Sequence, residues 1–472
     1  MIIRLAKVLY EKRFYILIIS QVIFFILFIA FLKSFLNTIL FNSKSGIDIF
    51  FYTNILNSLP EALIIAFILS LFFVYCRKRI FNFLMKIEEK RLLYSLLIFF
   101  LVCQVFILLF IKTIPFSDSQ IYVEHSERLY VTGSFLNQYG HKTAFFPVGL
   151  PIVLLLFKII FDEMILYAKI FNILISVISM YVIYRVFKLI LNEREIKIFL
   201  FSFFLFPNNF FMVNPILTEQ YFTLLLWLFI YFSLKNHKHN AIINGILLGL
   251  MLYFRSYTFL IFIFLILYFF REKEFLKNLK KIGLTFIVMM IVASPWIIRN
   301  YLVFDAFVPM TTNGGFNFLM GNHKNSSGSI NFNFKYNYEN PNEVEESNLA
   351  YKRGIIDLIN NPLKSVALIP LKLFHTYKRG DIYLTYSFKK TRNYISPLLM
   401  SLIFTLTNLF FYFVIFVGIL KTILRKSFRY KERFLFFILI SFLLVCVIYV
   451  GNERYLVPFL PFHFYLFSIE VK

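Results

Sequence analysis

The 472 residues are 60% hydrophobic and only 16% charged, with a mean hydropathy of +0.74, so a soluble protein of this length could not cover its surface with polar groups. Several apolar stretches exceed the roughly 18 residues that cross a bilayer as a helix, which predicts an all-α polytopic membrane protein. The formal net charge of +24 does not require a nucleic-acid partner, because membrane proteins concentrate Lys and Arg in cytoplasmic loops.

Apolar segments recur along the chain and alternate with short basic segments. In chain order, the predicted spans lie near 14–36, 53–76, 92–113, 144–161, 163–184, 196–213, 216–234, 241–256, 257–270, 282–303, 396–420, 433–450 and 454–470. More than half of the 49 Lys and Arg residues fall in 4–13, 77–91, 185–197, 235–240, 271–281 and 421–433 or at Lys472. The excess of positive charge places these basic segments in the cytoplasm.

The basic segments 77–91 and 185–197 can both be cytoplasmic only if an even number of crossings separates them, yet three candidate spans lie between them. The segment 144–161 is short, and Pro147, Gly149 and Pro151 break its first turn, so we interpret it as a re-entrant or partial segment. About twelve crossings then remain, with both termini in the cytoplasm. The alternative, in which 185–197 faces outward, stays open.

This topology leaves 114–143, 208–215, 305–394 and 451–454 on the non-cytoplasmic side. The middle of the long segment, GNHKNSSGSINFNFKYNYENPNEVEES, is rich in Asn, Ser and Gly and is typical of a loop. The stretch that follows, LAYKRGIIDLINNPLKSVALIPLKLFHTY, mixes apolar and basic residues at helical spacing. It predicts juxtamembrane helices on the membrane surface.

The sequence PFSDSQIYVEHSERL at 115–129 brings several ionisable residues to the point where a span leaves the bilayer. Tyr122, His125 and Leu129 follow Asp118 at helical spacing, so Asp118 is predicted to open a short interfacial helix. One interpretation is that Asp118 acts only as the N-cap of that helix. A functional interpretation needs partners elsewhere in the chain.

Four other charged residues are predicted to lie at the same outer rim. Glu219 begins a span, Arg255 stands between two short spans, Arg299 lies near the outer end of its helix, and Arg454 begins the last span. Charged groups at membrane depth are costly and tend to face a cavity or one another. Snorkelling would explain any single one of them. Together with Asp118, these residues favour a shared polar cavity.

A cavity of this composition suits one kind of chemistry. A carboxylate can take a proton from an attacking hydroxyl group. Guanidinium groups can bind a phosphate leaving group in a bidentate manner, and an apolar groove between helices can hold a lipid tail. Together these groups are suited to the transfer of a sugar from a lipid phosphate.

The order of several short motifs resembles that of the bacterial branch of the GT-C glycosyltransferases, which is related to the dolichyl-phosphate-mannose protein mannosyltransferases. The resemblance extends over 92–470, and each motif alone is weak, but their order and spacing are typical of the superfamily. The motifs are SDSQIY, FFPVGLPIVL, NPILTEQ, GILLGLMLYFR, PWIIRN, NGGFNFLMGN, INNPLKSVALIPLKLF and RYLVPFLP.

The resemblance implies a helical membrane bundle with outer juxtamembrane helices, in which Asp118 is the general base and 145–151 shapes access for the lipid. The implied site residues are the catalytic Asp118 and Glu219, the donor-phosphate-binding Arg255, Arg454, Lys142 and His141, and the acceptor or loop contacts Tyr122, His323 and Arg299.

The resemblance also implies substrates and location. A monosaccharide would move, with inversion, from a polyprenyl-phosphate donor to a glycan, lipid or protein hydroxyl on the non-cytoplasmic face of the plasma (inner) membrane. Many relatives carry two adjacent acidic residues where this chain has Asp118 and Ser119. No metal ligand is therefore assigned, and a requirement for a divalent metal stays open.

The predicted organisation has four parts. Residues 1–91 form an N-terminal addition of two spans, and 92–304 form the catalytic transmembrane core with the outer loop 114–143. Residues 305–394 form a non-cytoplasmic loop with a surface helix, and 395–472 hold the C-terminal spans.

Two other functions compete with the transferase. A flippase or transporter of a lipid-linked saccharide would also use outer arginines and a groove, but such proteins often have broken helices in both halves. This chain shows one broken segment and no internal repeat. A polysaccharide polymerase would also have many spans and a large outer loop. The acidic first loop and the proline-rich segment after it favour the transferase.

Overall fold

The computed structural model describes residues 7–8, 11–12, 55, 57–235, 239–270, 275–330, 342–391, 395–425 and 427–470. The regular structure of these residues is helical apart from isolated β-bridges, so the predicted all-α fold is confirmed for them. The helices are α4 (Leu59–Lys86), α5 (Glu89–Phe110), α6 (Asp118–Thr132), α7 (Gly149–Phe161), α8 (Met164–Lys188), α9 (Glu193–Phe204), α10 (Pro207–Phe210), η1 (Phe211–Val213), α11 (Thr218–Leu234), α12 (Asn240–Leu252), α13 (Thr258–Phe270), α14 (Phe275–Phe304), α15 (Asn313–Asn322), α16 (Glu343–Asn360), α17 (Pro362–Tyr377), α18 (Ile382–Phe388), α19 (Pro397–Leu424), α20 (Tyr430–Ile448), η2 (Glu453–Phe459) and α21 (Leu460–Ser468).

The predicted apolar spans coincide with these helices from 53–76 onward, whereas 14–36 lies outside the described residues. Within the described part, 5 helices are long and apolar enough to cross a membrane, namely α4, α5, α8, α14 and α19. The pair formed by α9 and α10–η1 would make up to 6 if it is one bent span. The total of about twelve crossings and the re-entrant character of 144–161, which contains the 13-residue α7, stay predictions.

The bent pair has a local cause. Pro207 begins α10 after a break that bends the two helices by 62°. Backbone groups freed at such a break need partners in an apolar interior. Asn209 Nδ2 donates to Phe203 O at 2.8 Å, and Asn172 Nδ2 on α8 donates to Pro215 O at 3.0 Å. The polar side chains inside this bundle therefore stabilise the predicted bend before α11.

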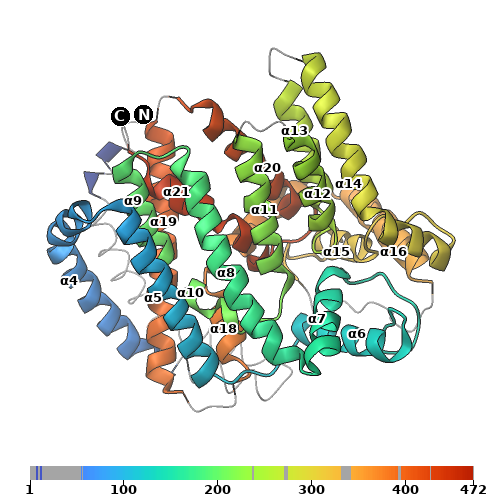
Figure 1. Ribbon diagram of the computed structural model, residues 1–472, viewed down its shortest axis with the longest axis horizontal. Helices are drawn as coiled ribbons and strands as arrows, with labels where there is room; N and C mark the ends of the chain where they lie inside the picture. The colour runs from blue at the N-terminus through green and yellow to red at the C-terminus, as the bar shows by residue number, and fades with distance from the viewer. Residues whose placement is uncertain are drawn as a thin grey trace.

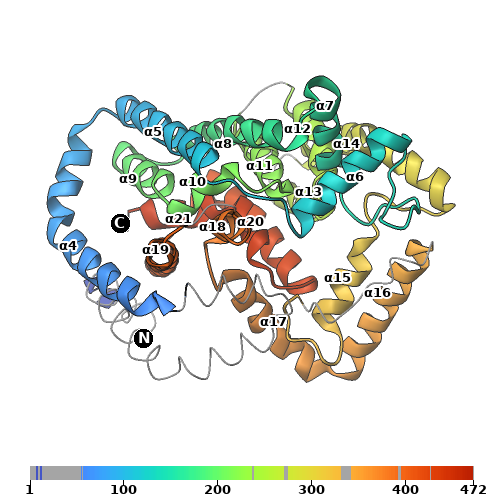
Figure 2. The same ribbon diagram turned by 90° about the horizontal axis from the view of Figure 1, so that it is seen from below.

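The 17-residue helix α11 lies at the centre of the molecule, where it packs against α8, α12 and η2 (Figure 1). The last helix, α21, packs against α9 and α19, and α4 lies at one edge beside α19. Seen from below, α16 and α17 lie along the side opposite α8 (Figure 2). Elements from distant parts of the sequence therefore meet around α11.

The segment predicted as a loop within 305–394 contains more helix than expected. Its first two residues end α15, and its last residues begin α16 at Glu343. The Asn342 side chain accepts from Glu345 N at 3.2 Å, and the first turn of α16 is acidic, which favours a helix start. The predicted juxtamembrane stretch forms α16 and α17, which are separated at Pro362. Their position on the membrane surface stays a prediction.

The four segments predicted to share one side of the membrane contact one another. Asn208 Oδ1 accepts from Tyr383 N at 2.9 Å, which joins 208–215 to 305–394. The segment 451–454 contacts both 114–143 and 305–394 through the ion pairs described below. In Figure 1, α6 and α18 lie at the end opposite the α8–α9 turn. The structure therefore gathers these segments at one end of the helical bundle.

Candidate active site

The first residue of α6 is Asp118, and the two residues before it fix its position. Ser117 has a φ of +52°, and the Phe116 ring stacks on Tyr386 with ring centroids 4.8 Å apart. The N-cap of α6 is Ser117, and the Asp118 side chain makes a contact with Arg454 instead. The interpretation of Asp118 as the N-cap is therefore wrong by one residue, although the predicted helix is present.

Four charged side chains from distant parts of the sequence form one cluster, which we call the four-charge cluster: Asp118, Glu219, Arg255 and Arg454. Arg454 Nη1 donates to Asp118 Oδ2, and Arg454 Nε donates to Glu219 Oε1 at 2.6 Å. Arg255 Nη2 lies 2.5 Å from the same Glu219 oxygen, in an ion pair that lacks hydrogen-bond alignment. The two carboxylates and two guanidinium groups have a formal charge of zero.

The members of the four-charge cluster differ in exposure. The exposed fraction is 1% for the Glu219 side chain, 11% for Arg454, 15% for Arg255 and 30% for Asp118. Among the described residues, Glu219 Oε2, Arg454 Nη2 and the Tyr383 hydroxyl are buried without a hydrogen-bond partner. Buried polar groups are normally paired, because leaving one unpaired costs about 1–3 kcal/mol. The cluster therefore contains an unpaired acceptor on Glu219 and an unpaired donor on Arg454, both of which are available to a polar ligand.

Aromatic rings line the cluster. The guanidinium carbon of Arg454 lies 5.8 Å from the centre of the Tyr386 ring, and that of Arg255 lies 5.9 Å from the Tyr455 ring. Tyr122 is buried on α6, and burial, with the nearby charge of Asp118, raises its pKa. The Tyr122 hydroxyl therefore stays protonated and is available as a hydrogen-bond donor.

The relative position of Glu219 and Arg454 is fixed by packing between α11 and η2. Trp227 lies two turns after Glu219 on α11 and is fully buried. Its Nε1 donates to Pro458 O in η2 at 3.0 Å. One helix pair therefore sets the distance between the acidic and basic members of the cluster.

The proline-rich segment after the first loop lies against the turn that carries Arg255. Gly149 N donates to Tyr253 O at 2.9 Å, and a Cβ at Gly149 would lie only 2.7 Å from that oxygen. No larger residue fits this close approach without movement of the backbone. The structure thus brings the start of α7 close to the cluster.

Four other candidates lie outside the four-charge cluster in the described contacts. Arg299 Nη1 donates to Thr143 O at 2.9 Å, so Arg299 holds the chain after α6. Lys142 is exposed and pairs with Leu136 in an isolated bridge, and His141 is half-buried in the same turn. His323 follows α15, where its Nδ1 accepts from a backbone N–H.

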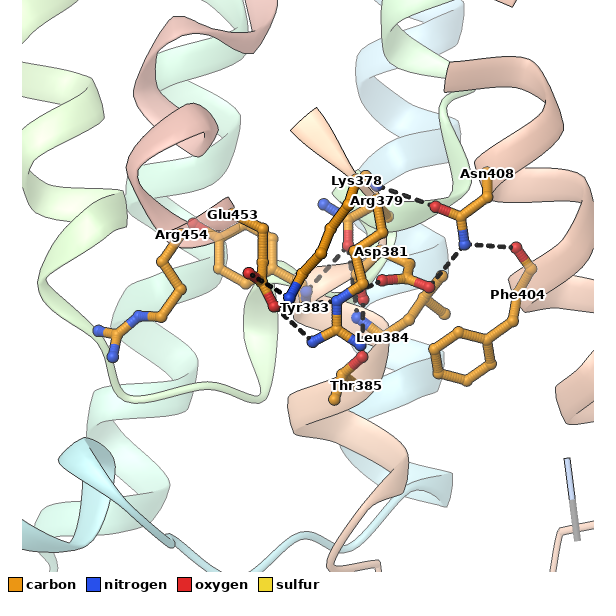
Figure 3. Close-up of polar contacts among 12 residues, drawn as sticks. Lys378, Arg379, Asp381, Tyr383, Leu384, Thr385, Phe404, Asn408, Glu453 and Arg454 are labelled. Atoms are coloured by element: carbon orange, nitrogen blue, oxygen red, sulfur yellow. Dashed lines mark hydrogen bonds and ion pairs between the residues drawn. The ribbon is translucent and has the colours of Figure 1, made fainter. Parts of the chain in front are cut away.

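Sequence reasoning missed a second ion-pair cluster beside the first. Lys378, Arg379 and Asp381 lie in the turn between α17 and α18, and Glu453 reaches Lys378 and Arg379 from η2 (Figure 3). The adjacency of Glu453 to Arg454 was the available signal. No group of three or more His, Cys, Asp or Glu side chains within the described part of the chain is arranged to hold a metal ion.

Residues 147–298 match the family model of dolichyl-phosphate-mannose-protein mannosyltransferase. This match confirms the predicted resemblance over those residues, which include Glu219 and Arg255. No curated protein sequence matches the chain.

Among solved structures, the chain is similar to the Archaeoglobus fulgidus oligosaccharyltransferase tethered with an acceptor peptide, with 15% identity and a TM-score of 0.47. The alignment covers 80% of this chain and 49% of that one, so the chain spans about half the length of the archaeal protein. It is also similar to ArnT from Cupriavidus metallidurans bound to undecaprenyl phosphate, with 11% identity, coverage of 79% and 76%, and a TM-score of 0.39.

Proposed function

We propose that this protein is a membrane glycosyltransferase that moves a monosaccharide from a polyprenyl-phosphate donor to a hydroxyl group of a glycan, lipid or protein on the non-cytoplasmic face. The convergence of Asp118, Glu219, Arg255 and Arg454, with unpaired buried atoms on both an acidic and a basic member, is the observation that carries the proposal. The family match over 147–298 supports a lipid-phosphate sugar donor.

The two arginines are suited to the donor phosphate. Arg454 Nη2 has no partner among the described residues, and Arg255 meets Glu219 through a single poorly aligned contact. Both groups therefore retain capacity for phosphate oxygens, which guanidinium binds through paired N–H donors. In an enclosed site such donors stabilise the negative charge that develops on the leaving phosphate more than they would in water.

Asp118 is suited to act as the general base. It is the most exposed of the four charged side chains, so an acceptor can reach it, and its contact with Arg454 orients the carboxylate. In the proposed step, Asp118 takes the proton of the acceptor hydroxyl while that oxygen forms a bond to the anomeric carbon. The bond from the anomeric carbon to the phosphate oxygen breaks, and its electron pair leaves with polyprenyl phosphate.

Glu219 is better suited to position the arginines than to contact the sugar. Its side chain is almost fully buried, and one of its oxygens meets both Arg454 and Arg255. A carboxylate between two guanidinium groups offsets their mutual repulsion and keeps both close to the same oxygen atom. The proposed division of labour is therefore one accessible carboxylate for proton transfer and one enclosed carboxylate for positioning.

The Asp118→Asn substitution tests the role of the base. Asn keeps the shape of the side chain but cannot accept the proton, so turnover should fall by about 10²–10⁴-fold. Binding of polyprenyl phosphate, measured as ligand-induced thermal stabilisation, should persist.

A matched control lies on the same helix. Glu124 accepts from Arg128 at 3.0 Å and is outside the cluster, so Glu124→Gln should leave turnover unchanged. Turnover of Asp118→Asn at the wild-type rate would remove Asp118 from the proposed mechanism.

A further inference from the structure

Glu453 and Arg454 are consecutive residues at the start of η2, yet they belong to different ion-pair clusters. Arg379 Nε and Nη2 lie 3.0 and 2.9 Å from Glu453 Oε1, and Lys378 Nζ lies 3.7 Å from the other carboxylate oxygen. In Figure 3, Glu453 points toward Lys378 and Arg379, whereas Arg454 points away from them. One short backbone segment therefore links the two clusters.

The residues before Glu453 are held by contacts of their own. Gly451 N donates to Gly328 O at 2.8 Å, and a Cβ at Gly451 would lie 2.1 Å from Lys372 O on α17. The Asn452 side chain accepts from Arg454 N at 2.9 Å. The backbone at Gly451 is therefore packed against α17, and the Asn452 side chain caps the start of η2. The Glu453 side chain then forms an ion pair with the α17–α18 turn.

The turn that carries Arg379 is itself fixed to α19. Asn408 Nδ2 donates to Asp381 Oδ2 at 2.7 Å, and Gly380 N donates to Asn408 Oδ1 at 2.9 Å. A Cβ at Gly380 would lie 2.6 Å from the Phe411 ring. The turn that carries Arg379 is therefore held against α19, and this fixes the position from which Arg379 pairs with Glu453.

We propose that Glu453 is a positioning residue, whose ion pair with Arg379 holds the start of η2 so that Arg454 faces the donor phosphate. This inference rests on the proposed function, because it assigns the benefit of the pair to donor binding. In this proposal Glu453 acts through Arg454 and is not assigned a contact with the donor. A displacement of a binding group by about 1 Å can cost about 100-fold in rate, so a fixed backbone at Arg454 matters for the donor step.

Two neutralising substitutions test the proposal. Glu453→Gln and Arg379→Gln each break the same pair, so both should raise the KM for the donor by about tenfold, equivalent to about 1.4 kcal/mol. The KM for the acceptor should stay unchanged. An effect of charge alone predicts opposite signs, because loss of a negative group would strengthen donor binding and loss of a positive group would weaken it.

Two further variants separate positioning from general damage. Arg379→Lys keeps the charge and part of the pairing, so it should recover donor KM toward the wild-type value. Glu432→Gln breaks a buried pair, in which Arg425 Nη2 lies 2.9 Å from Glu432 Oε1, at the opposite end of α20 from 451–454. It should lower the Tm without changing donor KM.

The affinity for polyprenyl phosphate alone, measured in the same variants, keeps the inference testable without turnover. Weaker binding by both Gln variants supports the positioning role. Unchanged affinity, or effects of opposite sign, would overturn it even if the wild-type protein transfers sugar. A wild-type protein that releases no lipid phosphate would instead count against the proposed function, whatever the two Gln variants do to lipid-phosphate affinity.

Discussion

The pairing of Glu219 with Arg255 should appear as a coupling energy in a double-mutant cycle. Glu219 is almost fully buried and lies 2.6 Å from Arg454 Nε and 2.5 Å from Arg255 Nη2. Glu219→Gln removes the only carboxylate within ion-pair distance of Arg255 among the described residues. Breaking a buried pair in this way costs about 3–5 kcal/mol, because a charge is left without compensation.

The cost should appear as a Tm below that of the wild type when both proteins unfold in the same detergent. Arg255→Gln should cost less, because Glu219 keeps Arg454 as a partner.

The loss of stability in the double variant is compared with the sum of the losses in the two single variants. Glu219→Gln combined with Arg255→Gln leaves no uncompensated arginine at position 255, so its loss should be smaller than the sum of the single losses by about 1–3 kcal/mol. Thermal unfolding of the purified protein in one detergent measures all three variants. A matched cycle between Arg255→Gln and Glu432→Gln, which lie in different ion pairs, should be additive. Additivity at Glu219 and Arg255 as well would refute the ion-pair reasoning.

Three further predictions concern other parts of the structure. Burial lowers the pKa of His125 to about 4, from an ordinary value of 6.5. Below pH 6.5 the unfolded chain therefore binds a proton that the folded protein does not. The free energy of unfolding should fall by up to about 1.4 kcal/mol per pH unit as the pH drops from 6.5 toward 4. His125→Asn should flatten the fall of Tm with pH across this range, and an unchanged profile would contradict the assignment. Gly451→Ala should lower the Tm because its Cβ would meet Lys372 O at 2.1 Å, whereas Gly283→Ala, where no atom lies within 4 Å, should not. Glu343→Ala should cost about 2–4 kcal/mol in thermal unfolding, because Glu343 accepts from Thr143, Ala144 and Thr312; a Tm equal to that of wild type would show that these bonds contribute little.

The helices were predictable from sequence because long apolar runs and basic interruptions report directly on burial in a bilayer. The start of α16 was not, because Glu343, Glu345 and Glu346 belong to a polar stretch without apolar periodicity. That helix begins with a side-chain cap from Asn342, and a cap is a weak signal in an Asn-rich segment.

The site was partly predictable for a different reason. Asp118, Glu219, Arg255 and Arg454 lie at helix ends predicted on the same side, and the structure brings all four together. Arg299 met the same criterion but contacts Thr143 instead, because a position along the membrane normal does not fix which way a helix faces.

The ion pair between Glu453 and Arg379 beside the site could not be deduced from the sequence. Glu453 follows Asn452 and precedes Arg454, and nothing in this order shows that the two charged side chains diverge. Arg379, its ion-pair partner, lies 74 residues before Glu453 in the sequence. Contacts of that kind depend on how α17, α18 and α19 pack, which periodicity does not specify.

The proposed role of the four-charge cluster is transfer of a sugar from a polyprenyl-phosphate donor to a hydroxyl acceptor. The most direct measurement offers the purified wild-type protein a panel of polyprenyl-phosphate sugars and follows free polyprenyl phosphate by mass spectrometry. We expect release from at least one donor, and this release should depend on an added hydroxyl acceptor. Release from no donor, together with movement of lipid-linked saccharide between the leaflets of reconstituted vesicles, would contradict the transferase and favour a flippase.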